Sequence, residues 1–211
     1  MNLLRLFLIS ITTLFLFACA EKKPVSIKEF HAENIQDFLM KMRVYSSVEG
    51  ALSIQYEGKN TLQGDASLRI SNNQLLLRVY YLGFPAGEIY EENGEASSTL
   101  PIEKERIKQL STSIRKGFLW WQGDFSIEEN SESYILKDHD SKRTIIIDKI
   151  EFKPLRQFLN IDGNNILITY DNYSKIQTED GTVINMPLKI EVLYKNRTLK
   201  INVERLKIKN A

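Results

Sequence analysis

The sequence predicts one α+β domain, in which a long antiparallel meander of strands has one helix before it and a second helix inserted into it. Most of the chain after residue 45 alternates apolar and polar residues with a period of two, as half-buried strands do. Residues 27–42 and 102–116 instead space their apolar residues three and four apart, as one face of a helix does. Many antiparallel strands in one chain tend to curl, so we expect a barrel or a half-barrel closed by the helices.

The first helix is predicted to begin after Ser26, an N-cap residue that completes a capping-box pattern with Glu29. His31 lies among charged neighbours on this helix, which favours a solvated position. The apolar face that needs a partner consists of Ile27, Phe30, Ile35, Phe38, Leu39 and Met42.

The clearest strand covers residues 62–70, where Leu62, Leu68 and Ile70 share one parity with small Gly and Ala residues. Those small residues indicate a bent sheet or room beside it. After a turn at Asn72-Asn73, the next strand places Leu75, Leu77, Val79 and Tyr81 on one side. Later strands are expected near residues 133–137, 144–152, 165–173, 188–194 and 198–209. The last changes parity part-way, which predicts a bulge near Glu204-Arg205.

The first twenty residues are typical of an export signal. Arg5 is their one charged residue, and the apolar run 6–18 is shorter than the roughly 20 residues that cross a bilayer. The run ends in Leu16-Phe17-Ala18-Cys19, which resembles a lipobox, where a signal peptide is cleaved and the new N-terminal cysteine acylated. We therefore expect a signal peptide at 1–18, a lipidated tether at 19–26 and a single domain at 27–211. The alternative is an ordinary membrane anchor with an incidental cysteine.

The single cysteine and the balance of charges limit which functions the chain is expected to have. Cys19 is the only cysteine, so the exported chain can form no internal disulfide, and acylation accounts for the odd thiol. Without Arg5, 27 basic residues face 27 acidic ones. This balance argues against nucleic acid and against a purely electrostatic hold on an anionic membrane. Ala20 stands where Asp would retain a lipoprotein in the inner membrane, which resembles an outer-membrane address.

No catalytic, metal or cofactor site is predicted. Neighbouring side chains of an extended chain point to opposite faces, so Asp138-His139-Asp140 cannot converge on one ion. Ser113 and Lys116 match a bare Ser-x-x-Lys, but the partner motifs of penicillin-recognising enzymes do not occur. No glycine-rich phosphate loop or zinc pattern occurs either. We therefore expect a protein that is not an enzyme.

Apolar residues stand where a turn is expected. Leu82, Phe84 and Pro85 occupy a connection between strands, after the amphipathic Tyr80-Tyr81. One interpretation is a hydrophobic tip that touches lipid or a partner, and the other is a loop folded back onto the core. For Trp120-Trp121, core filling is favoured over a ligand-binding role.

These features together resemble the LolA/LolB superfamily of lipoprotein carriers and receptors. The best local pieces are residues 75–83, 186–190 and 201–206. LolB-like receptors carry a Leu-Gly step in a protruding loop, and Leu82-Gly83 matches it. The resemblance implies a membrane-contact loop of Leu82, Gly83 and Phe84, with Leu82 inserting into the bilayer. Tyr80-Tyr81 replaces the Asn-Pro that often precedes this step. The implied fold is an incomplete β-barrel whose N-terminal and inserted helices form a lid over an apolar cavity.

In that family the cavity holds the acyl chains of a lipoprotein in transit. The implied partners are the membrane, acyl chains of lipoproteins or lipids, and a periplasmic carrier protein. The expected lining is Ile35, Phe38, Leu39, Leu62, Leu68, Ile70, Leu75, Leu77 and Val79. Two other hypotheses remain. One is a structural or assembly lipoprotein whose interior is filled and whose surface docks an envelope complex. The other is a tethered hydrolase, which would need a polar cleft with convergent titratable groups.

Overall fold

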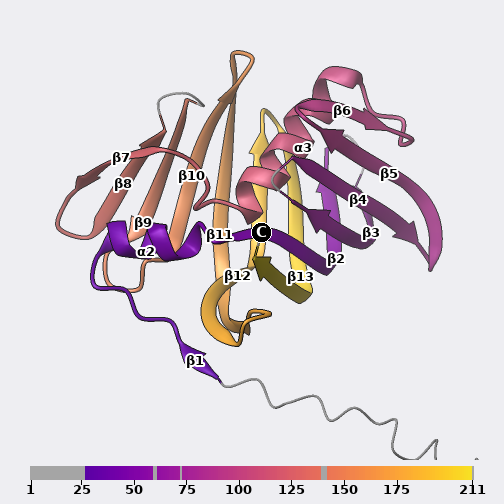
Figure 1. The fold of residues 1–211 in the computed structure, drawn as a ribbon. Coiled ribbons are helices and arrows are strands. Elements are labelled where there is room, and N and C mark those ends of the chain that lie inside the picture. The colour runs from indigo at the N-terminus through magenta and orange to yellow at the C-terminus, as the bar shows by residue number, and fades with distance from the viewer. Residues whose placement is uncertain (1–26, 59–60, 72, 139–141, 211) are drawn as a thin grey trace, which may run out of the picture.

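A computed structural model describes residues 27–58, 61–71, 73–138 and 142–210. Two helices and thirteen strands occur in these ranges (Figure 1). In chain order they are β1 (Lys28–Glu29), α2 (Ile35–Met42), β2 (Tyr45–Glu57), β3 (Thr61–Ile70), β4 (Gln74–Tyr81), β5 (Phe84–Glu92), β6 (Glu95–Ser98), α3 (Lys104–Phe118), β7 (Phe125–Glu129), β8 (Ser133–Asp138), β9 (Arg143–Asp148), β10 (Pro154–Ile161), β11 (Asn164–Gln177), β12 (Thr182–Tyr194) and β13 (Arg197–Asn210).

The strands form one curved sheet in the order β6-β5-β4-β3-β2-β13-β12-β11-β10-β9-β8-β7. All pairings along this path are antiparallel, and the short β1 adds a parallel pairing to β12. Within the described chain, β6 and β7 are the two ends of the path and do not pair with each other, so the sheet is not closed into a barrel. The predicted class, an α+β fold with an incomplete antiparallel barrel and two helices, is confirmed.

The helices lie against the concave side of the sheet. In Figure 1, α3 lies between the two wings of the sheet, and α2 lies beside the wing of β8 to β10. Side chains from both helices join one core cluster with the inward residues of the strands. Each fully buried apolar side chain stabilises the fold by about 1.5–3 kcal/mol. The concave side is therefore where the core, and any internal site, must lie.

The predicted start of the first helix is wrong. The helix begins at Ile35, and Asn34 caps it by accepting a hydrogen bond from the Asp37 backbone N–H at 2.9 Å. Upstream of the cap, Lys28 and Glu29 form β1, because the Lys28 N–H donates to the Gly181 carbonyl. Ser26, the expected cap, lies outside the described residues.

Two predicted boundaries also need correction. The strand expected to reach residue 152 ends at Asp148, whose Oδ1 accepts the backbone N–H groups of Ile150 and Glu151 and so forms a turn. The loop expected at 82–85 is shorter, because Phe84 and Pro85 already belong to β5. Strands β1, β6, β7 and β10 were not predicted. The bulge predicted near residues 204–205 is present, as a register shift between Val203 and Arg205 against β2.

Candidate functional site

The inward parity predicted for the early strands forms part of the core. Of the nine residues expected to line a cavity, Ile35, Phe38, Leu39, Leu68, Ile70, Leu75 and Leu77 are buried, and Val79 is half-buried and packs against the same cluster. Leu62 shares the inward parity of β3 but is 65% exposed, because it lies near the end of the β2–β3 hairpin, beyond the packed part of the strand. Eight of the nine residues therefore belong to the core, those of α2 beside the wing of β8 to β10 and the others on β3 and β4 (Figure 1).

Aromatic side chains fill the space next to α2. The ring of Phe38 stacks on that of Trp120, with centroids 5.7 Å apart and planes 16° from parallel. Phe30 meets Phe38 edge-on at 5.4 Å, and Phe152 packs on its other side at 5.3 Å. Trp120 also contacts Trp121 edge-on, and both tryptophans are buried. The two tryptophans therefore lie in the core, at the place where α2 meets the β9–β10 turn.

A buried ion pair lies inside the wing formed by β7 to β10. Arg143 on β9 and Asp138 on β8 are cross-strand partners, and Nη2 of Arg143 lies 3.1 Å from Oδ2 of Asp138. Arg143 also donates to the Gln122 carbonyl, and its guanidinium lies over the Phe125 ring at 4.8 Å. Burial lowers the pKa of Arg143, while Asp138 opposes that shift. A charge enclosed in this way depends on its partner.

Helix α3 carries a second set of polar groups toward the interior. Burial, reinforced by the charge of Arg143, lowers the pKa of Lys116 from 10.5 to about 8. Arg115 lies 2.8 Å from the buried Glu91 and so links α3 to β5. Ser113 donates to the Gln109 carbonyl at 2.6 Å, which ties its hydroxyl to the helix backbone. Sequence patterns singled out Ser113 and Lys116 only as a bare Ser-x-x-Lys match. The pairing of Arg115 with Glu91 was not predicted, because the two residues meet only when α3 packs against β5.

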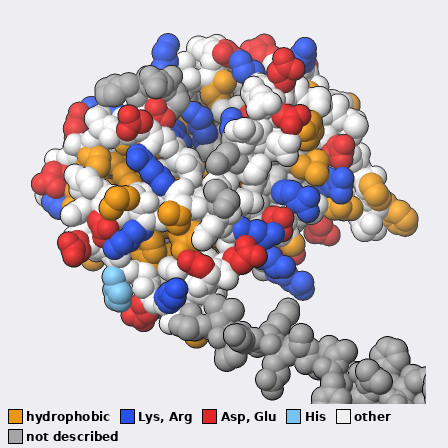
Figure 2. All heavy atoms as spheres, in the orientation of Figure 1, with side chains coloured by type: hydrophobic (Ala, Val, Ile, Leu, Met, Phe, Trp, Pro, Cys, Tyr) orange, Lys and Arg blue, Asp and Glu red, His pale blue; other side chains and the backbone are white. Residues whose placement is uncertain are grey.

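The β4–β5 hairpin ends in an exposed apolar tip. We use the name apolar tip for Tyr81, Leu82, Gly83 and Phe84. Leu82 is 80% exposed and Phe84 75% exposed, so the connection is not folded back onto the core. Figure 2 shows hydrophobic side chains at the right-hand edge of the molecule, over the end of this hairpin.

The backbone at the apolar tip is unusual for a leucine. Leu82 and Gly83 have φ angles of 51° and 80°, as in a two-residue hairpin turn. The corresponding turns Asn93-Gly94 and Asp162-Gly163 begin with Asn or Asp, residues that tolerate the left-handed region. A residue with a larger side chain loses about 1–2 kcal/mol there.

The remaining residues considered in the sequence do not form a metal-binding group among the described residues. Cys19 and His139 lie outside the described residues. His31 is exposed, and its Nε2 lies 3.6 Å from Glu29. Among the residues that the structure describes, no three His, Cys, Asp or Glu side chains are grouped as metal ligands, and no helix is long and apolar enough to cross a membrane.

Comparison with solved structures identifies the same architecture elsewhere. A crystal structure of an outer membrane lipoprotein-sorting protein domain from Vibrio parahaemolyticus superimposes with a TM-score of 0.53 and 10% identity, covering 77% of this chain and 85% of that one. A LolA superfamily protein from Nitrosomonas europaea gives a TM-score of 0.53 and 14% identity, covering 83% and 94%. No family model and no curated protein matches the sequence. The chain therefore has a LolA/LolB-like fold, as its sequence resemblance implied.

Proposed function

We propose that this chain is an outer-membrane lipoprotein that binds acyl chains of lipoproteins or lipids and delivers them to the membrane. Acylated Cys19 would hold it at the periplasmic face, and a periplasmic carrier protein would supply the cargo. The LolA/LolB-like fold supports a lipoprotein-binding or sorting role, because the solved structures with this fold include a lipoprotein-sorting domain.

The apolar tip is the observation that carries the proposal. Leu82 occupies a strained left-handed position and is 80% exposed, so in the free protein its burial does not offset its strain. An Asn or Gly would fit the turn better. A leucine in this place is explained if its side chain enters an apolar phase during function. The hydrocarbon of a bilayer is such a phase, and Phe84 and Tyr81 lie beside Leu82 to enter with it or rest at the interface.

The interior supplies a suitable environment for acyl chains. Each methylene moved from water to an apolar site gains about 0.8 kcal/mol, so even a partly sheltered chain is held firmly. The aromatic cluster of Phe38, Trp120 and Phe152 occupies this space in the present conformation. Cargo would therefore enter by displacing α2, which is only eight residues long, and return of Phe38 onto Trp120 would favour release.

The test uses the chain from Ala20 onward, which lacks Cys19 and retains every described residue. A fluorescent fatty-acid probe is titrated into it, and co-flotation with phosphatidylethanolamine vesicles is measured in parallel. Leu82→Glu is compared with Ile150→Glu, because Ile150 is 88% exposed and lies away from the tip, in the β9–β10 turn. We expect all three proteins to bind the probe saturably and only Leu82→Glu to lose vesicle association. Equal loss in both variants would remove the tip from the mechanism.

A second function is supported by a different observation. Trp120, Trp121 and Phe118 fill the interior, as expected of a structural or assembly lipoprotein that uses the same fold for protein docking. The titration separates the two functions. A folded protein that fails to bind the probe at any concentration would favour docking over transport.

A further inference from the structure

The outer face of the sheet, on the side away from the core, carries a hollow of about 370 Å³. Ala51 on β2 and Ser67 on β3 pair across the two strands at its floor. Both side chains are short, so the surface is low at this point. Longer side chains from β2, β3, β4 and β13 stand around them. We call this surface the basic hollow, and its ring is Glu49, Arg69, Leu76, Arg78, Arg205 and Lys207.

The bulge in β13 orients two cations of the basic hollow, Arg205 and Lys207. Before the bulge, the outward residue Asn202 pairs with Ser53 of β2. In a regular strand, residues 204, 206 and 208 would continue on that side. The extra residue reverses the parity, so Arg205 pairs with Ala51 and Lys207 pairs with Glu49 on the outer face. The same reversal sends Ile208 into the core, where it is buried.

The basic hollow has an excess of positive charge. Four cations and one carboxylate stand in its ring, which leaves three positive charges in excess. Nε of Arg69 lies 3.3 Å from Glu49, so one of the cations is paired. Arg205 and Lys207 form no salt bridge with any residue in the described chain. Two neighbouring pairs, Lys209 with Glu49 and Arg78 with Glu88, add one charge of each sign and leave the excess unchanged.

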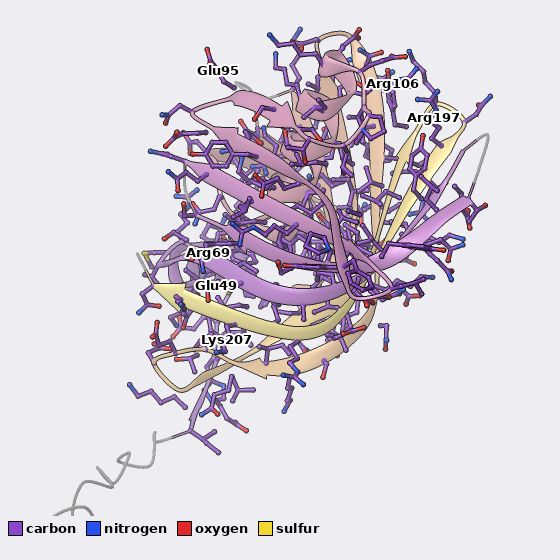
Figure 3. All side chains as sticks on the ribbon, turned by 90° about the vertical axis from the view of Figure 1, so that its right-hand side faces the viewer. Glu49, Arg69, Glu95, Arg106, Arg197 and Lys207 are labelled. Atoms are coloured by element: carbon purple, nitrogen blue, oxygen red, sulfur yellow. The ribbon has the colours of Figure 1, made fainter. Side chains whose placement is uncertain are left out.

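The carboxyl group of Glu49 is affected by the positive charges that surround it. A hydrogen bond from Lys209, together with the charges of Lys209, Arg69 and Lys207, lowers the pKa of its carboxyl group. Figure 3 shows Arg69, Glu49 and Lys207 on neighbouring strands, at the opposite end of the molecule from Arg106 and Arg197. The positive charge is therefore concentrated, although the chain as a whole carries a net charge of +1.

The basic hollow lies toward the tethered end of the domain. The Lys28 N–H of β1 donates a hydrogen bond to the Gly181 carbonyl, and β1 pairs with the start of β12. Gly181 belongs to the turn between β11 and β12. In this turn the Glu179 N–H donates to the Ile208 carbonyl at 3.1 Å, and Ile208 follows Lys207 in β13. Nine residue-to-residue steps separate Cys19 from Lys28, and they can span about 30 Å at most. A lipid on Cys19 would therefore hold this face within reach of the bilayer surface.

We propose that the basic hollow binds the anionic head groups of membrane phospholipids and sets the orientation of the domain on the bilayer. The inference uses the lipid tether of the proposed function, but it does not depend on acyl transport. Cations near an anionic surface each strengthen attachment about fivefold at moderate ionic strength. Arg78 lies on β4, and Leu82 follows four residues later in the turn after this strand. Head-group binding at the basic hollow would therefore bring the apolar tip toward the bilayer.

The experiment measures co-sedimentation of the chain from Ala20 onward with two kinds of vesicle, phosphatidylcholine alone and phosphatidylcholine containing phosphatidylglycerol. The test variant is the double substitution Arg205→Glu and Lys207→Glu. The control is Arg156→Glu with Lys175→Glu, which makes the same charge change at two exposed residues of β10 and β11 that form no described salt bridge. We expect the test variant to bind anionic vesicles at least about 30-fold more weakly than the parent, and the control to bind within about threefold of it. Added salt should weaken the parent and leave the residual binding of the test variant nearly constant.

Equal binding of the parent and the test variant to anionic vesicles would overturn the proposal. If the same variant also lost affinity for polyglutamate, the basic hollow would be assigned to an acidic protein. The outcome is separate from that of the proposed function, because fatty-acid probe binding and the Leu82→Glu variant do not involve these residues. Failure of the probe titration alone would leave a head-group site on a docking lipoprotein.

Discussion

The ring of Phe38 on α2 lies on that of Trp120, 5.7 Å between centroids and 16° from parallel, and this stack closes the concave side of the sheet next to the β9–β10 turn. Stacked aromatic pairs of this kind add about 0.5–1.5 kcal/mol beyond their area burial. Four apolar side chains of this eight-residue helix, Ile35, Phe38, Leu39 and Met42, are buried, whereas Met40 is exposed. Under the proposed function, an acyl chain that enters beside α2 would displace this stack.

Phe38→Ala should lower stability and strengthen acyl binding together. Loss of a buried phenylalanine costs about 3–5 kcal/mol, and the vacated volume can shelter further methylenes of a bound chain. We expect a lower urea midpoint and about tenfold tighter binding of the fatty-acid probe, which corresponds to roughly two methylenes. Phe158→Ala is the control, because Phe158 is 44% exposed on β10. Unchanged or weaker probe binding by Phe38→Ala would place the acyl chain elsewhere.

Asp138→Asn should destabilise the wing of β7 to β10. The substitution leaves the guanidinium of Arg143 buried without its counter-charge, which costs about 3–5 kcal/mol. Urea unfolding of the single variant is compared with that of a double variant, Asp138→Leu with Arg143→Leu. The double variant should be the more stable of the two, because it buries no charge. A loss below about 1 kcal/mol in Asp138→Asn would indicate that water reaches the pair.

The strands with strict alternation could be predicted from the sequence, and so could the bulge in β13. Both depend on a local pattern, because a change of parity in an amphipathic strand requires an extra residue to keep the apolar side chains inside. The start of the first helix could not be predicted. Residues 27–30 match helical spacing, but the Lys28 N–H donates to Gly181, about 150 residues later, and Lys28 and Glu29 pair with β12. A distant pairing of this kind leaves no periodic signal in the sequence.

Of the candidate site, the apolar tip could be predicted, because apolar residues at a turn contradict ordinary turn composition. The basic hollow could not be predicted. Its cations come from β3, β4 and β13, and they converge only when those strands pair with or lie beside β2. The overall balance of charges, which argued against an electrostatic hold on the membrane, carries no information about where the charges lie.

Lys116→Met should stabilise the protein at neutral pH. Folding lowers the pKa of Lys116 from 10.5 to about 8, so below pH 8 the folded state holds a proton that it binds less tightly than the unfolded chain does. That cost is fully present at pH 7 and is relieved as the pH rises from about 8 toward 10.5. After allowance for partial exposure, we expect a gain of roughly 1–2 kcal/mol at pH 7.

The gain should shrink at higher pH. Urea unfolding at pH 7 and pH 9.5 measures the difference between parent and variant at each pH. Lys175→Met is the control, since Lys175 is exposed, and its effect should be the same at both pH values. A gain from Lys116→Met that does not change with pH would show that the methionine acts through packing and not through the removed charge.

Leu82→Asn should raise stability and abolish vesicle association in one substitution. Asn tolerates the φ of 51° that Leu82 adopts, and the exposed leucine contributes little burial, so we expect a gain of about 0.5–1 kcal/mol in urea unfolding. Co-flotation with phosphatidylethanolamine vesicles should fall to background, because the polar side chain has no gain from entering the bilayer. In this explanation stability rises while membrane association falls. If Leu82 had a structural role instead, stability and membrane association would fall together. A stabilised variant that still floats with vesicles would mean that Phe84 and Tyr81 are sufficient for membrane contact.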